Sequence, residues 1–63
     1  MTQYKFETCT VATIYGAQRE IPAGIYPVAE LSVVTVQLGP SSRVDMTPAE
    51  FSRLKLGRLA VRL

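Results

Sequence analysis

The side chains that could perform catalysis are few and scattered along this chain. It contains no histidine, and Cys9 is its single cysteine, so this thiol lacks the partner that most often activates a catalytic cysteine. Its neighbours Thr8, Thr10 and Val11 are typical of a strand, which favours a small buried core residue over a reactive thiol. We therefore expect no nucleophilic catalysis.

The carboxylates indicate neither an acid–base pair nor a metal site. They are dispersed along the chain, as Glu7, Glu20, Glu30, Asp45 and Glu50. Acid–base catalysis needs titratable groups that are held together, and a zinc site needs sulfur or imidazole ligands. We expect a protein that is not an enzyme and that uses no metal or other cofactor.

Basic side chains gather in the last third of the chain. Residues 1–42 carry a net charge of −1 and residues 43–63 a net charge of +3, within a total of +2. The basic residues of the second part are Arg43, Arg53, Lys55, Arg58 and Arg62. Alternation should place Arg58 and Arg62 on one solvent-facing side of a strand, with Ala60 between them. Such a set could be a solvated face, a protein contact surface or a surface for nucleic-acid phosphates.

Two other polar or exposed features have an ordinary structural explanation. Residues 39–43, Gly-Pro-Ser-Ser-Arg, could present amides, hydroxyls and a guanidinium to a phosphate, but we favour a simple hairpin turn. A partly apolar second face is expected from outward-pointing Val33, Thr35 and Gln37, together with an outward parity of Tyr26 and Val28. Such a face could mark a partner surface or a dimer seam, or be covered by the first strand.

The chain is one short domain, residues 1–63, with a small core. Apolar residues make up 48% and charged residues 19%, which is typical of a folded domain. No basic start followed by an apolar block is visible, and no apolar run approaches the roughly 20 residues needed to cross a bilayer. We expect a cytoplasmic protein with no membrane partner.

Strand-forming residues dominate the first part of the chain. Residues 3–15 predict a strand or hairpin arm, in which Tyr4 and Phe6 share one parity and Cys9 and Val11 the other. A break is therefore expected near residues 8–10, because a slip of one residue reverses the buried face. A polar connector should follow at residues 16–20.

Four more strand segments are predicted downstream. Residues 21–24 should lead in, with Gly24 in a backbone conformation closed to other residues, and Pro27 should place part of the next strand, residues 25–31, on an edge. Residues 32–38 alternate most clearly, and residues 43–46 pair back on them. In residues 58–63 the alternation puts Leu59, Val61 and Leu63 on the face opposite the arginines. The inward residues of the two middle segments should be Val34, Val36, Leu38, Val44 and Met46.

A short helix is expected between the last two strands. Thr47 can cap it, Glu50 can reach back to complete a capping box, and Gly57 is a suitable stop. Phe51 and Leu54 share its apolar face. The alternative is one helix that continues to the C-terminus, broken only at the glycine.

The segment Ile-Pro-Ala-Gly-Ile-Tyr-Pro-Val at residues 21–28 resembles the part of bacterial SH3-like domains in which a glycine-containing turn leads into a barrel strand. The short helix before a final strand also resembles the SH3 layout. The resemblance implies an all-β fold, a small SH3-like barrel of about five antiparallel strands with one short helix before the last strand. The chain has no tryptophan for an aromatic groove, which argues against recognition of proline-rich peptides.

We expect a non-catalytic binding protein that contacts another protein or protein complex. A short, cysteine-poor binder fits an accessory product of a phage, plasmid or bacterium, acting as inhibitor or adaptor of a bacterial host machine such as a defence complex. The candidate contact residues are Tyr26, Arg43, Arg53, Lys55, Arg58 and Arg62. The alternatives are a nucleic-acid-binding barrel that uses the basic C-terminal surface and a homo-oligomer built by pairing strand edges.

Overall fold

The computed structural model describes residues 1–63 and consists mostly of β-strands, with one short helix. The elements in order are β1 (Thr2–Phe6), β2 (Cys9–Ala12), β3 (Gln18–Ile21), β4 (Gly24–Glu30), β5 (Val34–Gly39), β6 (Ser42–Met46), α1 (Pro48–Leu56) and β7 (Ala60–Arg62). Five strands form one antiparallel sheet in the order β6-β5-β4-β1-β7, and β2 pairs with β3 alone. A five-stranded antiparallel sheet and a short helix before the last strand are therefore present as expected, and the β2–β3 pair is additional.

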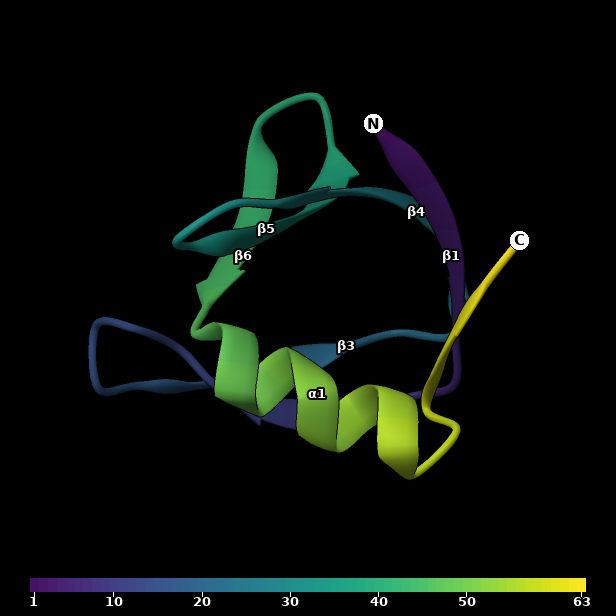
Figure 1. Ribbon diagram of the computed structural model, residues 1–63. Coiled ribbons are helices and arrows are strands. Elements are labelled where there is room, and N and C mark those ends of the chain that lie inside the picture. Colours follow the sequence, from purple (N-terminus) through teal and green to yellow (C-terminus); the bar gives the residue numbers. More distant parts are fainter.

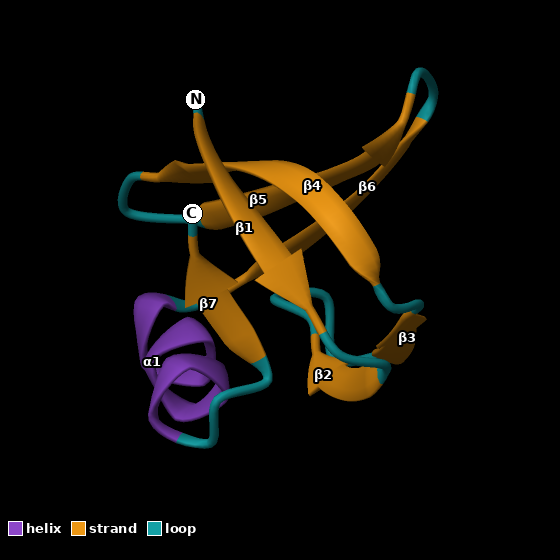
Figure 2. Ribbon diagram, turned by 90° about the vertical axis from the view of Figure 1, so that its right-hand side faces the viewer, coloured by secondary structure: helices purple, strands orange, loops and turns teal.

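The five-stranded sheet has β6 and β7 as its edges, and its strands are curved (Figure 1 and Figure 2). In Figure 1 its strands curve over the helix, which crosses the lower side of the molecule. Figure 2 shows β7 between β1 and α1, with the β2–β3 hairpin on the other side. The prediction of a polar connector at residues 16–20 was wrong in part, because β3 begins at Gln18. Only Ile21 of this strand is buried, so β3 shows no alternating pattern. Residues 18–21 form a strand because they pair with β2.

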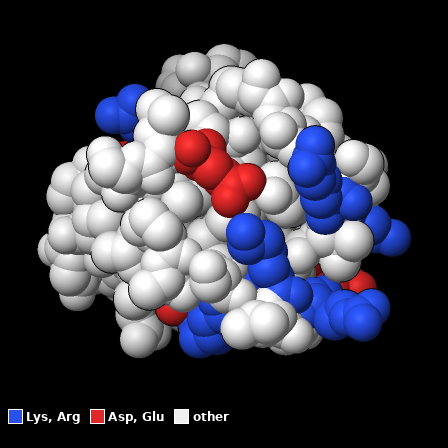
Figure 3. Space-filling view, in the orientation of Figure 1, with Lys and Arg blue, Asp and Glu red and all other residues white.

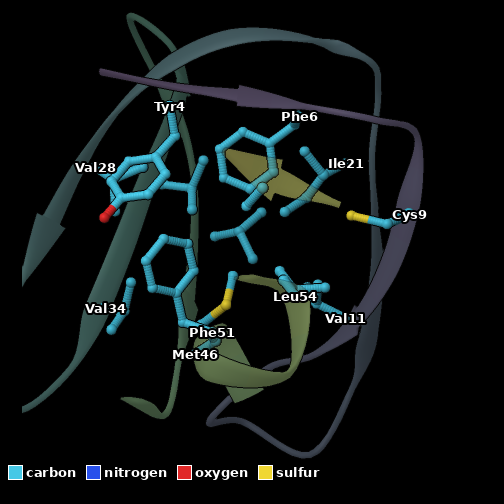
Figure 4. Packing of buried hydrophobic residues seen from close by; sticks show 13 residues of the cluster. Tyr4, Phe6, Cys9, Val11, Ile21, Val28, Val34, Met46, Phe51 and Leu54 are labelled. Atoms are coloured by element: carbon cyan, nitrogen blue, oxygen red, sulfur yellow. The ribbon is translucent and has the colours of Figure 1, made fainter. Parts of the chain in front are cut away.

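One hydrophobic cluster fills the space between the sheet, the hairpin and the helix (Figure 4). Its buried members are Tyr4, Phe6, Cys9, Val11, Ile21, Val28, Val34, Val36, Val44, Met46, Phe51, Leu54 and Ala60. The predicted change of parity in the first segment is confirmed, since β1 ends before Glu7 and β2 starts at Cys9. The inward residues predicted for β5 and β6 are buried as well, except Leu38, which is half-buried against the core.

The side-chain parity predicted for β4 was wrong. Val28 is buried and Tyr26 is half-buried against the core, so Ile25 and Pro27 occupy the outward positions instead. Tyr26 pairs with Tyr4, a core residue of β1, and directly opposed residues share a face. The edge position predicted for Pro27 is confirmed, because β5 pairs with β4 only from Val28 onward.

Gly24 serves a close contact and not an unusual backbone angle. Its φ does not lie in the left-handed region, so the predicted special conformation is wrong. A Cβ at this position would instead lie 2.9 Å from the Tyr26 hydroxyl and 3.0 Å from the adjoining ring carbon. Glycine is therefore needed here because the Tyr26 ring folds over the start of its own strand.

The helix begins as predicted, but the residue whose backbone conformation ends it is not Gly57. The Thr47 hydroxyl accepts the Glu50 N–H at 3.1 Å, and the helix stops at Leu56, before Gly57. The left-handed residue that ends it is Arg58, with φ 60°, while Gly57 has an ordinary φ of −80°. The two bonds of a Schellman motif are present, from the Leu59 N–H to the Leu54 carbonyl at 2.9 Å and from the Arg58 N–H to the Lys55 carbonyl at 3.1 Å.

The face predicted for the last strand is reversed. Ala60 is buried, with 3% of its surface exposed, whereas Val61 is 47% exposed and Leu63 66% exposed. The register with β1 explains this, because Ala60 lies opposite inward Phe6 and Val61 lies opposite outward Lys5. The small side chain of Ala60 takes the inward position, where β7 contacts α1. The larger apolar residues therefore face solvent.

Candidate functional site

Tyr26, predicted as an exposed contact residue, has structural contacts of its own. Its hydroxyl donates to the Pro22 carbonyl at 2.8 Å, and its ring lies 5.7 Å from that of Phe6 between centroids. The half-buried ring thus seals one end of the core and holds the turn before β4. These contacts leave Tyr26 with less free surface than the sequence suggested.

Arg43 lies apart from the other predicted residues. It is exposed on β6, which is the edge of the five-stranded sheet opposite β7. Its Nε is 3.7 Å from Asp45 Oδ2, at the long end of the range for an ion pair. The structure therefore does not bring Arg43 together with the arginines of the C-terminal segment.

Asp45 is a structural residue that sequence reasoning did not single out. Only 7% of it is exposed, and its carboxylate accepts the Thr35 hydroxyl at 2.7 Å and the Tyr15 hydroxyl at 2.8 Å. These hydrogen bonds hold the pKa of Asp45 below its ordinary value. The Asp45 carbonyl also accepts the Ile14 N–H at 3.1 Å. Asp45 thus fastens the loop between β2 and β3 to the edge of β6, and no local sequence signal marks that contact.

Glu50 and Arg53 connect the helix to the free edge of β2. The Glu50 carboxylate accepts the Ala12 N–H at 2.8 Å and the Arg53 Nε at 2.8 Å, and Arg53 Nη2 donates to the Thr10 carbonyl at 3.2 Å. Arg53 and the Ala12 N–H lower the pKa of Glu50 to about 2. The predicted capping box is wrong, because the Glu50 side chain bonds to β2 and not back to the start of its own helix. The charge of Arg53 is thus used inside the molecule.

Lys55 is also paired within the chain. Its Nζ donates to Glu30 Oε1 at 3.3 Å and lies 5.0 Å from the centre of the Phe51 ring. The other Glu30 oxygen accepts the Tyr4 hydroxyl at 2.7 Å. The Tyr4 hydrogen bond is the main cause that lowers the pKa of Glu30, and Lys55 adds to it. Glu30 therefore neutralises Lys55 and ties β4 to the helix.

Arg58 and Arg62 are the predicted residues whose charges remain unpaired. Both are exposed, and neither forms a hydrogen bond or ion pair through its side chain. They do not share a strand face, because Arg58 lies in the turn before β7. In Figure 3 the blue side chains gather along the lower and right sides, where Figure 1 shows α1 and the C-terminal strand. The structure thus collects four predicted residues on α1, on β7 and in the turn between them, and leaves two of these charges free.

An exposed apolar face lies on the outer side of the strands next to this turn. Register places Ile25 of β4 and Val61 of β7 on either side of Lys5 in β1, and Leu63 follows one row away, bonded to the Gln3 carbonyl. Ile25 is 57% exposed. We call Lys5, Ile25, Val61 and Leu63 the outer face. Sequence reasoning missed it because Val61 and Leu63 were assigned inward, and the alternation of a strand does not say which parity is buried.

The surface carries no pocket, and no three His, Cys, Asp or Glu residues come together. No helix has the length and apolar character needed to pass through a lipid bilayer. No protein-family model matches the chain, and neither a curated protein nor a solved structure resembles it significantly.

Proposed function

We propose that the protein is a non-catalytic binding module that contacts another protein or protein complex. The observation that carries the proposal is the exposure of Ile25, Val61 and Leu63 side by side on the outer face. These side chains stand on paired strands, so a partner could cover them without first ordering a loop. Adjacent exposed apolar residues with charges at their edge are typical of protein interfaces.

The proposal includes a finer description of the fold and of the partner. A bent five-stranded sheet with its short helix between β6 and β7 supports an SH3-like barrel. The partner class that we propose is a larger bacterial machine, such as a defence complex, which an accessory protein of phage or plasmid origin blocks or adapts. Small size and a rigid sheet surface fit that role.

The test is affinity capture from a bacterial lysate with and without nuclease, followed by mass spectrometry. We expect a stoichiometric protein partner that survives nuclease and is lost with Val61→Glu. Leu56→Glu is the matched control, because Leu56 is 86% exposed but lies on the helix and is not part of the outer face. Retention of the partner by Val61→Glu, or capture of nothing above background, would contradict the proposal.

A nucleic-acid surface is the second candidate, favoured by the unpaired charges of Arg58 and Arg62. It predicts that captured material disappears with nuclease and that affinity falls steeply with salt, because bound phosphates release counterions. Substituting both arginines by alanine would then abolish binding, while Val61→Glu would weaken it far less. The two candidates therefore give opposite results in the same experiment.

A further inference from the structure

We infer that the partner's contact surface is acidic as well as apolar, so that carboxylates meet Lys5 and Arg58 while apolar side chains cover Ile25 and Val61. The inference rests on the proposed function and names the chemistry of its partner.

Lys5 lies within the apolar outer face rather than beside it. Its register partners are Ile25 on one side and Val61 on the other, both exposed on that face. No hydrogen bond or ion pair engages the Lys5 ammonium. A partner that covers the two apolar neighbours must also remove water from this ammonium, which is costly unless a carboxylate or several acceptors replace the water.

The free charge beside the outer face has the same sign as Lys5. Arg58, in the turn before β7, forms no ion pair, whereas the cations of the helix are neutralised by Glu50 and Glu30. Arg62 belongs to the opposite face, because it lies opposite Tyr4 and its charge acts on Glu30. Glu7, directly after β1, is the acidic residue nearest to Lys5 along the chain, and its N–H donates to the Leu59 carbonyl. The surroundings of β7 therefore keep a positive excess that an acidic partner would match.

The backbone of Arg58 gives a separate indication. Its φ of 60° places it in the left-handed region, where glycine is the usual residue at this position of a helix end. Gly57 stands one position earlier and does not supply that conformation. An arginine held in a disfavoured conformation is a cost to folding, and such outliers concentrate at functional positions. A contact made by the guanidinium would account for an arginine at this position.

A second copy of this chain fits the outer face less well than an acidic partner does. In a two-fold dimer the same patch meets itself, so Lys5 in the middle of one face would approach Lys5 of the other. Arg58 at the edge would add a further charge of the same sign. Like charges in a desolvated interface oppose association.

The test uses the ¹⁵N-labelled full chain and three synthetic amphipathic helical peptides, followed by NMR. One peptide has a leucine stripe flanked by glutamates, the second the same stripe flanked by lysines, and the third serines in place of the leucines and glutamates at the flanks. We expect the Leu/Glu peptide to shift the amide signals of Lys5, Ile25 and Val61, and to bind at least about tenfold more tightly than either other peptide.

Four variants of the protein sharpen the result. Lys5→Glu should weaken binding of the Leu/Glu peptide about tenfold, and Arg19→Glu, an exposed cation on β3, should leave it unchanged. Arg58→Gly should weaken binding several-fold although it raises the midpoint of urea unfolding, a combination that a merely structural role would not produce. Arg58→Ala should weaken binding without that gain in stability.

Several results would overturn the inference. Equal affinity for the Leu/Lys peptide, unchanged binding by Lys5→Glu, or no shift at millimolar Leu/Glu peptide would each show that the surface does not select acidic partners. Dimerisation of the free protein that is lost with Val61→Glu would assign the outer face to self-association. If an acidic surface is excluded but a nuclease-resistant partner is captured as above, the proposed function stands and only this inference fails.

Discussion

The Glu50 carboxylate joins the helix to the edge of β2. It receives a backbone N–H from β2 and the guanidinium of Arg53 on its own helix. Its side chain is largely covered, and its pKa is about 2 in the folded protein against an ordinary 4.5. A carboxylate with a depressed pKa stabilises the fold above its unfolded pKa, and this contribution is lost as pH falls through the folded pKa.

We expect Glu50→Gln to lower the free energy of unfolding by about 1–2 kcal/mol at pH 7, less than the full shift would imply because water still reaches the ion pair. The variant should also lose less stability than the parent between pH 4.5 and pH 2. Urea unfolding at several pH values measures both effects. Glu20→Gln is the control, since Glu20 is exposed and unpaired. A Glu50→Gln curve parallel to that of the parent would show that the carboxylate is not engaged in solution.

Gly24 has no room for a side chain unless the Tyr26 ring moves. Gly24→Ala should destabilise the protein by about 1–2 kcal/mol, because the new methyl group displaces the Tyr26 ring and weakens its bond to the Pro22 carbonyl. The penalty should shrink in a Tyr26→Phe background, where the hydroxyl 2.9 Å away is absent. Gly39→Ala is the matched control, with nothing within 4 Å of the added carbon. Equal losses in both backgrounds would contradict the contact.

At the scale of the element, the helix covers the core and also protects a strand edge. Phe51 and Leu54 are buried in the core. Glu50 and Arg53 form hydrogen bonds with backbone groups on the open side of β2. An uncovered strand edge is a site for pairing with other chains, so side chains that satisfy it act against aggregation. One short helix therefore contributes both to packing and to the protection of an edge.

The two leucines of the helix provide a direct test of that packing. Leu54→Ala should lower the free energy of unfolding by about 2–5 kcal/mol because it leaves a cavity in the core, whereas Leu56→Ala should change it by less than about 0.5 kcal/mol. Thermal and urea melts measure both. Leu54→Met, which keeps the volume, should cost less than about 1.5 kcal/mol and remain folded if the alanine variant does not. Similar effects at both leucines would mean that the helix is not docked.

At the scale of the whole molecule, a single hydrophobic cluster links the sheet, the hairpin and the helix. A chain of this length has a stability of about 3–9 kcal/mol, so the loss of any one element should unfold the rest. Cys9 reports on this cooperativity, because its thiol is buried in the cluster and burial raises its pKa.

We expect a thiol reagent at pH 8 to label native Cys9 at least about a hundredfold more slowly than the urea-unfolded chain, since labelling requires opening of the core. Leu54→Ala should accelerate labelling about tenfold for each 1.4 kcal/mol of stability that it loses, and Leu56→Ala should not accelerate it. The absorbance of the chromophore that the reagent releases measures the labelling rate. Labelling of the native protein at the unfolded rate would show that Cys9 is not protected by the core.

Local patterns determined much of this fold by themselves. The capped start of the helix, its apolar pair Phe51 and Leu54, the parity change between β1 and β2 and the buried series of β5 and β6 could all be predicted, because each depends on neighbours along the chain. The concentration of basic residues near the C-terminus was equally plain. These properties follow from backbone periodicity and from the order of residue types, which are local.

Which side of a strand is buried, and which charges remain free, was decided only by the tertiary structure. Val61 and Leu63 face solvent because register with β1 gives the inward position to Ala60, and no periodicity within a three-residue strand contains that information. Arg53 and Lys55 lose their free charge to Glu50 and Glu30, while Arg58 and Arg62 keep theirs, although all four look alike in the sequence. Pairing across long sequence separations depends on where whole elements meet, and a linear pattern does not encode it.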